Sequence, residues 1–130
     1  MAKKKIELDL KRTVVAFVNG VKVINCTDRM MFFLDDTGLV PVGPCGLMIE
    51  AEKIQQRYLS SGKASLFKVE YKKTEKGQKA IREIRAQCGD EVYILGSEEA
   101  MKAYKALVHR PKLVFPDQSF FDTVNFEIYL

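Results

Sequence analysis

Few residues of this chain could perform covalent chemistry, and Cys45 is the strongest candidate among them. Cys45 lies between Pro44 and Gly46, directly before a segment that we predict to be helical. The positive end of a helix dipole lowers the pKa of a thiol and favours the nucleophilic thiolate. His109 is the one histidine in the sequence, so it is the imidazole that could act as the base. Cys45 and His109 therefore define one alternative function, a thiol-dependent enzyme, whereas a small buried side chain in a turn explains Cys45 without catalysis.

The sequence contains no motif that is typical of metal or cofactor binding. Cys26, Cys45 and Cys88 are widely spaced and form no C-x-x-C pair, and a single histidine cannot build a His-rich zinc site. Neither the G-x-G-x-x-G nor the Walker phosphate-binding pattern occurs. We therefore predict no metal and no cofactor, and we interpret the cysteines as reduced thiols of a cytoplasmic protein.

Positive charge is unevenly distributed along the chain. Residues 63–87 contain eight basic and three acidic side chains, a surplus of five, which exceeds the net charge of +4 for the whole sequence. In a helical projection the basic residues of this region lie opposite an apolar arc, and two lysines precede the helix N-terminus, where free N–H groups favour a phosphate. The candidate polyanion-binding residues, within 72–85, are Lys72, Lys73, Lys76, Lys79, Arg82 and Arg85. An ordinary solvated helix face is the competing interpretation.

A binding protein fits the sequence better than an enzyme, because no acid, base and nucleophile converge in it. The leading hypothesis is contact with nucleic acid through the basic helix, with Phe67 and Tyr71 stacking on bases if they face outward. The alternative is a protein–protein or self-assembly role, in which a homo-oligomer forms through exposed strand edges at residues 39–42 or 123–130. Ile49, on the odd face of a predicted helix, would add a second contact.

Length and composition are those of one domain covering residues 1–130. With 130 residues, of which 47% are hydrophobic and 29% charged, the chain can bury a core without disulfides or a metal. No apolar run approaches the roughly 20 residues that a membrane-spanning helix needs, so we expect no membrane partner. Glu7 and Asp9 interrupt the stretch that could serve as a secretory signal, which again favours the cytoplasm.

A β-hairpin over residues 13–26 is the local structure around which the other elements are placed. Asn19 and Gly20 stand between two β-rich runs and are typical of a type I′ turn, which would pair Val18 with Val21. The resulting strands carry apolar side chains on both faces. We therefore expect at least part of this hairpin to be covered on both sides.

The other elements of the first half are a strand, a second hairpin and a helix, at residues 6–10, at 30–34 with 39–42, and at 47–59. Pro41 places the return strand of the second hairpin at the edge of a sheet. The helix is predicted from an apolar stripe at helical spacing, formed by Leu47, Ala51, Ile54 and Tyr58.

The second half alternates strands with helices. We expect strands at 65–71, 91–95, 113–115 and 123–130, and helices at 75–87 and from Ser97 to about Val108. Thr74 and Gly89 delimit the first of these helices. The order predicts a mixed α/β (α+β) fold with about three helices, in which N-terminal hairpins precede a βαβαβ unit and a final antiparallel strand of one mixed sheet.

The segment 35–38, D-D-T-G, with I-L-G at 94–96, resembles the signatures of retroviral-type aspartic proteases. In such enzymes the aspartate, here Asp36, would share a proton with its twin in a dimer. The predicted helices do not suit that nearly all-β fold, and D-D-T-G is also what a plain hairpin turn favours. We therefore interpret the motif as the turn of the second hairpin.

Overall fold

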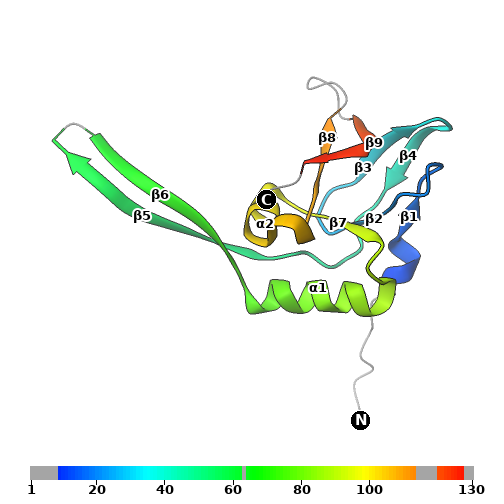
Figure 1. Ribbon diagram of the computed structural model, residues 1–130, viewed down its shortest axis with the longest axis horizontal. Coiled ribbons are helices and arrows are strands. Elements are labelled where there is room, and N and C mark those ends of the chain that lie inside the picture. Colours follow the sequence, from blue (N-terminus) through cyan, green and yellow to red (C-terminus); the bar gives the residue numbers. More distant parts are fainter. Residues whose placement is uncertain (1–8, 63, 114–119, 128–130) are drawn as a thin grey trace, which may run out of the picture.

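The computed structural model describes residues 9–62, 64–113 and 120–127, and Figure 1 shows a body from which a long arm projects. The strands of the body are β1 (Val15–Ala16), β2 (Lys22–Asn25), β3 (Met31–Asp35), β4 (Gly38–Val42), β7 (Val92–Leu95), β8 (Arg110–Leu113) and β9 (Phe120–Glu127). Its helices are α1 (Glu75–Cys88) and α2 (Glu98–Tyr104), with short 3-10 turns η1 (Leu10–Thr13) and η2 (Lys105–Leu107). The arm consists of β5 (Ala51–Ser61) and β6 (Ala64–Lys73). The mixed α/β class predicted from the sequence is confirmed, with two α-helices in these residues.

The strands of the body enclose one apolar interior. They form two sheets, ordered β1-β2-β7 and β4-β3-β9-β8, in which β2 runs parallel to β7 and β3 parallel to β9. Three backbone hydrogen bonds link the sheets: His109 N–H donates to Ile94 (2.8 Å), Gly96 N–H donates to His109 (3.0 Å), and Cys45 N–H donates to Asn25 (2.8 Å). The interior is filled by Phe17, Val23, Met31, Phe33, Val42 and Leu95, with Phe121 and Phe126 packed against them.

A second core lies between β2, β7 and the two helices. Val23 and Leu95 point into the interior enclosed by the strands, whereas their neighbours Ile24 and Ile94 belong to the core formed with α1 and α2. The helical contribution to that core comes from Ala80, Ile81, Ile84, Ala100, Ala103 and Tyr104. The expectation that the first hairpin is covered on both sides is therefore confirmed for β2.

The helix predicted over residues 75–87 is confirmed as α1. The Thr74 hydroxyl accepts a hydrogen bond from the Gly77 N–H (3.0 Å), and Gly89 ends the helix at a φ of +82°. The next helix is shorter than predicted. α2 ends at Tyr104 and continues as η2, and Leu107, which falls within the predicted helix, is exposed.

The arm replaces the helix predicted over residues 47–59, which was wrong. β5 and β6 pair antiparallel from Ala51 with Lys73 to Ser61 with Ala64, with an irregularity between Arg57 and Leu59. At about 3.4 Å per residue the ten residues of β6 extend roughly 34 Å. The apolar stripe at helical spacing led to this wrong prediction. The arm does not pack one face on a core, so its sequence lacks the strict alternation of apolar and polar residues that marks a strand.

The first hairpin has a different turn from the one predicted. Val15 pairs with Val23, one residue out of the predicted register. Gly20 N–H donates to Phe17 (2.9 Å) and Phe17 N–H donates to Val21 (2.8 Å), which closes a three-residue loop. Gly20 alone in this loop has a positive φ, +89°. The geometry is that of a type I turn followed by a glycine bulge rather than a type I′ turn.

The remaining elements confirm some sequence boundaries and correct others. The second hairpin is β3 and β4, closed by Asp35 opposite Gly38, and segment 35–38 is its turn. The predicted strand over 6–10 falls largely outside the described residues, and Leu10 begins η1 instead. β8 and β9 both start three residues earlier than predicted.

The predicted βαβαβ unit and single mixed sheet are also corrected. Within the described residues β6 pairs with β5 alone, so the strands fall into three sheets. The parallel contacts come from β2 with β7 and β3 with β9. Neither α1 nor α2, the helices of the described chain, is long and apolar enough to span a membrane.

Candidate functional site

The base of the arm is fixed to the body by hydrogen bonds centred on Tyr104. The Tyr104 hydroxyl donates to the carbonyl oxygen of Glu50 (2.8 Å) and accepts from the N–H of Thr74 (3.1 Å). The Thr74 hydroxyl donates to the same Glu50 carbonyl (3.1 Å). A Cβ on Gly77 would collide with the Tyr104 hydroxyl and the Glu50 carbonyl, so only glycine fits there. Because Glu50 precedes β5 and Thr74 follows β6, this network holds both strands of the arm where they leave the body.

Beyond its base the arm exposes large apolar side chains. Leu66, Phe67 and Val69 are 52%, 49% and 42% exposed. Strand alternation places Phe67 and Val69 on one face, together with Arg57, whose guanidinium carbon lies 5.9 Å from the centre of the Phe67 ring. A two-stranded ribbon has no further layer in which to bury such side chains, and isolated ribbons are only marginally stable in water.

The charge of the arm is positive. Residues 51–73 contain six basic and two acidic side chains, a surplus of four. Lys68 Nζ lies 3.2 Å from Glu70, but both groups are largely exposed, so this ion pair adds little stability. The arm therefore presents apolar side chains in cationic surroundings.

The six residues predicted to bind a polyanion divide between the base of the arm and α1. Five of them are exposed and form no ion pair within the described chain: Lys72, Lys73, Lys76, Lys79 and Arg82. The sixth, Arg85, donates to the carbonyl oxygens of Gly89 (3.0 Å) and Val92 (2.7 Å). It therefore ties the end of α1 to the start of β7 and is less available for a ligand.

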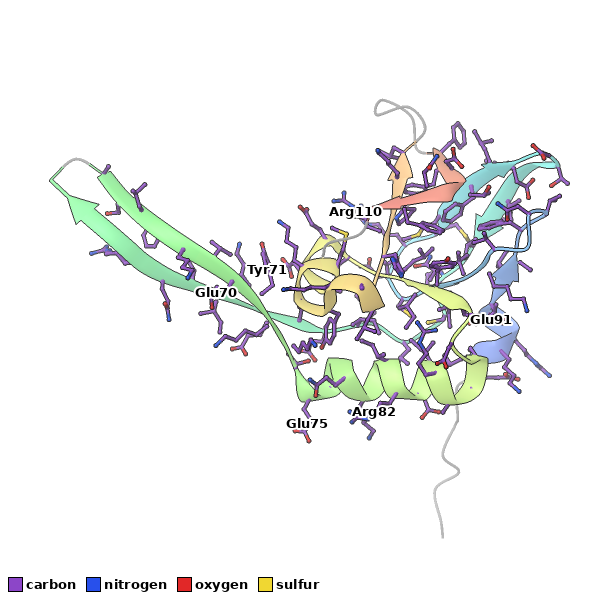
Figure 2. The ribbon with its side chains drawn as sticks, in the orientation of Figure 1. Glu70, Tyr71, Glu75, Arg82, Glu91 and Arg110 are labelled. Atoms are coloured by element: carbon purple, nitrogen blue, oxygen red, sulfur yellow. The ribbon has the colours of Figure 1, made fainter. Side chains whose placement is uncertain are left out.

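The outward face of α1 is less basic than the helical projection indicated. Glu75 and Glu83 are exposed along it, and Figure 2 shows Glu75 and Arg82 both pointing away from the body. Of the aromatic residues proposed to stack on bases, Phe67 is exposed. Tyr71 is half-buried where the arm meets α2, with Lys102 Nζ 5.2 Å from the centre of its ring.

A second exposed apolar surface lies on the outer side of β4, β3 and β9. Strand alternation sends Phe33 and Val42 inward. The side chains left on the outer side, which we call the apolar sheet face, are Phe32, Leu34, Leu39, Pro41 and Phe120. They are neighbours, because Phe32 pairs with both Pro41 and Phe120, and Leu34 pairs with Leu39. Leu39 is 50% exposed.

The structure places the two strand edges expected to mediate assembly, residues 39–42 and 123–130, in different surroundings. β4, which contains residues 39–42, ends its sheet as Pro41 indicated. Residues 123–127 lie on β9 and pair with β8 on one side, whereas the pairing of β9 with β3 ends at Asp122, and 128–130 lie outside the described residues. Ile49 is buried in the helix-side core rather than exposed on a contact surface.

A hollow of about 470 Å³ lies at the β3–β4 turn, at one end of the apolar sheet face. It is lined by Val18, Asn19, Leu34, Asp35, Asp36, Asp122 and Thr123. Three of these residues are aspartates and none is basic. Hydrogen bonds from Thr37, first from its hydroxyl, hold the pKa of Asp35 below its usual range, so this carboxylate stays ionised near neutral pH.

Cys45 contacts Cys26 rather than His109. The two sulfur atoms lie 3.6 Å apart, and both side chains are buried. Hydrogen bonding from the Cys26 thiol, with a smaller contribution from the Leu47 backbone, lowers the pKa of Cys45 to about 7, and the same pairing raises that of Cys26. We expected a helix dipole to lower the pKa of the Cys45 thiol, but residues 47–50 are not helical. The neighbouring Cys26 thiol is the cause instead.

His109 is part of a buried aromatic cluster. Its ring centre lies 5.2 Å from that of Tyr93 and 6.2 Å from that of Phe126. Its Nδ1 has no hydrogen-bond partner within the described residues. Burial, assisted by the positive charge of Arg85, lowers the pKa of His109. The pair proposed for thiol catalysis is therefore not assembled.

No protein-family model, curated protein sequence or solved structure matches this chain. The site must be judged from its own geometry. The arm is the candidate element that sequence reasoning missed. Its signal was the run of small residues Ser60, Ser61 and Gly62 between two segments of similar length, the second of which carries Phe67, Val69 and Tyr71 at alternate positions.

Proposed function

We propose that this protein is a self-assembling binding module whose β5–β6 arm is the docking element. The observation that carries the proposal is the exposure of Leu66, Phe67 and Val69 on an arm whose base is held by hydrogen bonds. Exposed apolar side chains gathered on one projecting element are typical of a protein–protein interaction surface. Docking through one face would bury Phe67 and Val69 and would supply the additional layer that a two-stranded ribbon lacks.

The fixed base supports docking for an entropic reason. An arm that is already ordered loses less conformational freedom on binding than a segment that folds on contact, so more of the burial free energy appears as affinity. The hydrogen bonds of Tyr104 with Glu50 and Thr74 supply that order. A cytoplasmic location belongs to this proposal, because Cys26 and Cys45 lie close together as free thiols.

Sedimentation velocity across micromolar to millimolar concentrations tests the proposal. We expect the mass to rise with concentration and expect Val69→Lys, on the arm, to keep the protein monomeric. Met48→Lys serves as the control, because Met48 is 54% exposed but lies between β4 and β5, outside both apolar surfaces. A wild-type protein that stays monomeric throughout would contradict the proposal.

A second candidate function, contact with nucleic acid or another polyanion, is supported by the exposed lysines at the base of the arm and on α1. A site that neutralises about four phosphates gives a log–log salt dependence of affinity with a slope near −3 to −4. Charge reversal at Lys79 and Arg82 should then weaken binding and flatten the slope. Lys22→Glu, an exposed lysine of β2, is the control. Equal affinity of all variants at low salt would leave α1 as an ordinary solvated face.

A further inference from the structure

We infer that the arm of one copy docks on the apolar sheet face of a second copy, so that molecules join head to tail. This inference rests on the proposed self-assembly and adds the receiving surface and the symmetry. Two exposed apolar surfaces are present on the described chain, one on the arm and one on β4, β3 and β9. Because both surfaces are exposed and apolar, contact between them would remove both from water.

The arrangement of the molecule makes this contact intermolecular. Figure 1 shows the arm extending to one side of the body while the β3–β4 hairpin lies on the opposite side. With its base held by hydrogen bonds of Tyr104, the arm points away from the sheet face of its own chain. Different surfaces at opposite ends define a heterologous contact, which yields a closed ring or an open filament.

Charge complementarity selects a second copy as the occupant. The strands and turn of the receiving surface, residues 31–42 and 120–127, contain four acidic residues and no basic residue. The arm has a surplus of four positive charges over residues 51–73. Complementary charges accelerate association and fix the orientation of the partners. The aspartate-lined hollow beside Leu34 can accept the end of a long cationic side chain such as Arg57.

The same charges disfavour a symmetric contact between two arms. An arm-to-arm dimer would bring two cationic ribbons together, and like charges across an interface reduce affinity. Extension of the sheet through the edge of β4 is also opposed, because Pro41 has no N–H to donate to an added strand. The side-chain face of the sheet is therefore the receiving surface.

Mixing two blocked variants tests the inference. Phe67→Glu disables the arm and leaves the sheet face intact, whereas Leu39→Lys places a cation on the sheet face and leaves the arm intact. Each variant alone should be monomeric, and a 1:1 mixture should give a heterodimer that grows no further. Wild type should continue to assemble beyond this size or close into a ring.

Each other outcome has its own meaning. If Leu39→Lys alone dimerises, the arms contact each other and the inference is overturned. If wild type assembles but the mixture stays monomeric, the receiving surface lies elsewhere, which also overturns the inference while self-assembly stands. A wild type that is monomeric at every concentration overturns both proposals. Leu39→Thr, a milder change at a half-exposed position, should weaken assembly about fivefold and guards against misfolding of the lysine variant.

Discussion

Replacing Phe67 and Val69 together by threonine should weaken assembly by a calculable amount, because both side chains lie on the same face of the arm. They are 49% and 42% exposed. Complete burial of a phenylalanine or valine contributes about 1.5–3 kcal/mol, so docking that buries the exposed part contributes about 1 kcal/mol for each residue. The pair therefore accounts for about 2 kcal/mol, which is roughly a 30-fold increase in the dissociation constant of each contact. Threonine keeps the β-propensity of the strand, so the arm itself should persist.

The assay is sedimentation equilibrium of wild type and the double variant, with an exposed leucine outside both apolar surfaces as control. Leu107→Thr changes a side chain of similar exposure, 45%, on η2, outside the arm and the apolar sheet face. We expect this control to assemble like wild type. Equal dissociation constants for wild type and the Phe67/Val69 double variant would refute the reasoning, provided that circular dichroism shows that the variant is folded.

Three further predictions concern the body. Gly77→Ala forces a methyl group against the Tyr104 hydroxyl, so it should lower the free energy of unfolding by about 1–3 kcal/mol in a denaturant titration; an unchanged midpoint would show that the base of the arm is not tightly packed. Cys26→Ala removes the hydrogen bond that lowers the pKa of Cys45, so the pH midpoint of Cys45 alkylation should rise from about 7; an unchanged midpoint would assign the low pKa to the backbone instead. His109 has a lowered pKa in the folded state, so the unfolded state takes up its proton first, and stability should fall as the pH drops below the ordinary value of 6.5. His109→Phe should remove this part of the pH dependence, measured by urea unfolding between pH 7 and 5, and an identical profile in the variant would argue against it.

Local signals in the sequence were sufficient for the elements that contain their own start and stop. α1 was predicted closely because Thr74 caps it and Gly89 ends it. The β3–β4 hairpin was predicted because segment 35–38 specifies a tight turn between two apolar runs. Such features act over a few residues, so they can be read without knowledge of the tertiary structure.

Elements that depend on distant partners were predicted poorly. β5 was assigned to a helix because its apolar residues continue a stripe at helical spacing. Its pairing with β6 depends on the tertiary structure and could not be read from that stripe. The exact pairing of the first hairpin was missed because Asn19 and Gly20 are compatible with two turn types.

The candidate site shows the same limit. The exposed lysines of α1 followed from periodicity, whereas the structural role of Arg85 depends on carbonyl oxygens beyond the helix. The contact of Cys45 with Cys26 joins segments 19 residues apart that are brought together by packing alone. Neither apolar surface could be found without knowing which face of each strand is covered.

The central claim, that the arm of one copy contacts the sheet face of another, can be measured directly by paramagnetic relaxation enhancement. Ser65, exposed on the arm, is replaced by cysteine and spin-labelled in the Leu39→Lys variant, in a background where the native cysteines are alanine. This protein is mixed with the ¹⁵N-labelled Phe67→Glu variant, whose sheet face is intact. The account predicts that the amide signals of Leu34 and Leu39 broaden in the ¹⁵N-labelled Phe67→Glu protein. Broadening confined to the arm of the ¹⁵N-labelled protein, or no broadening while the two proteins associate, would contradict this prediction.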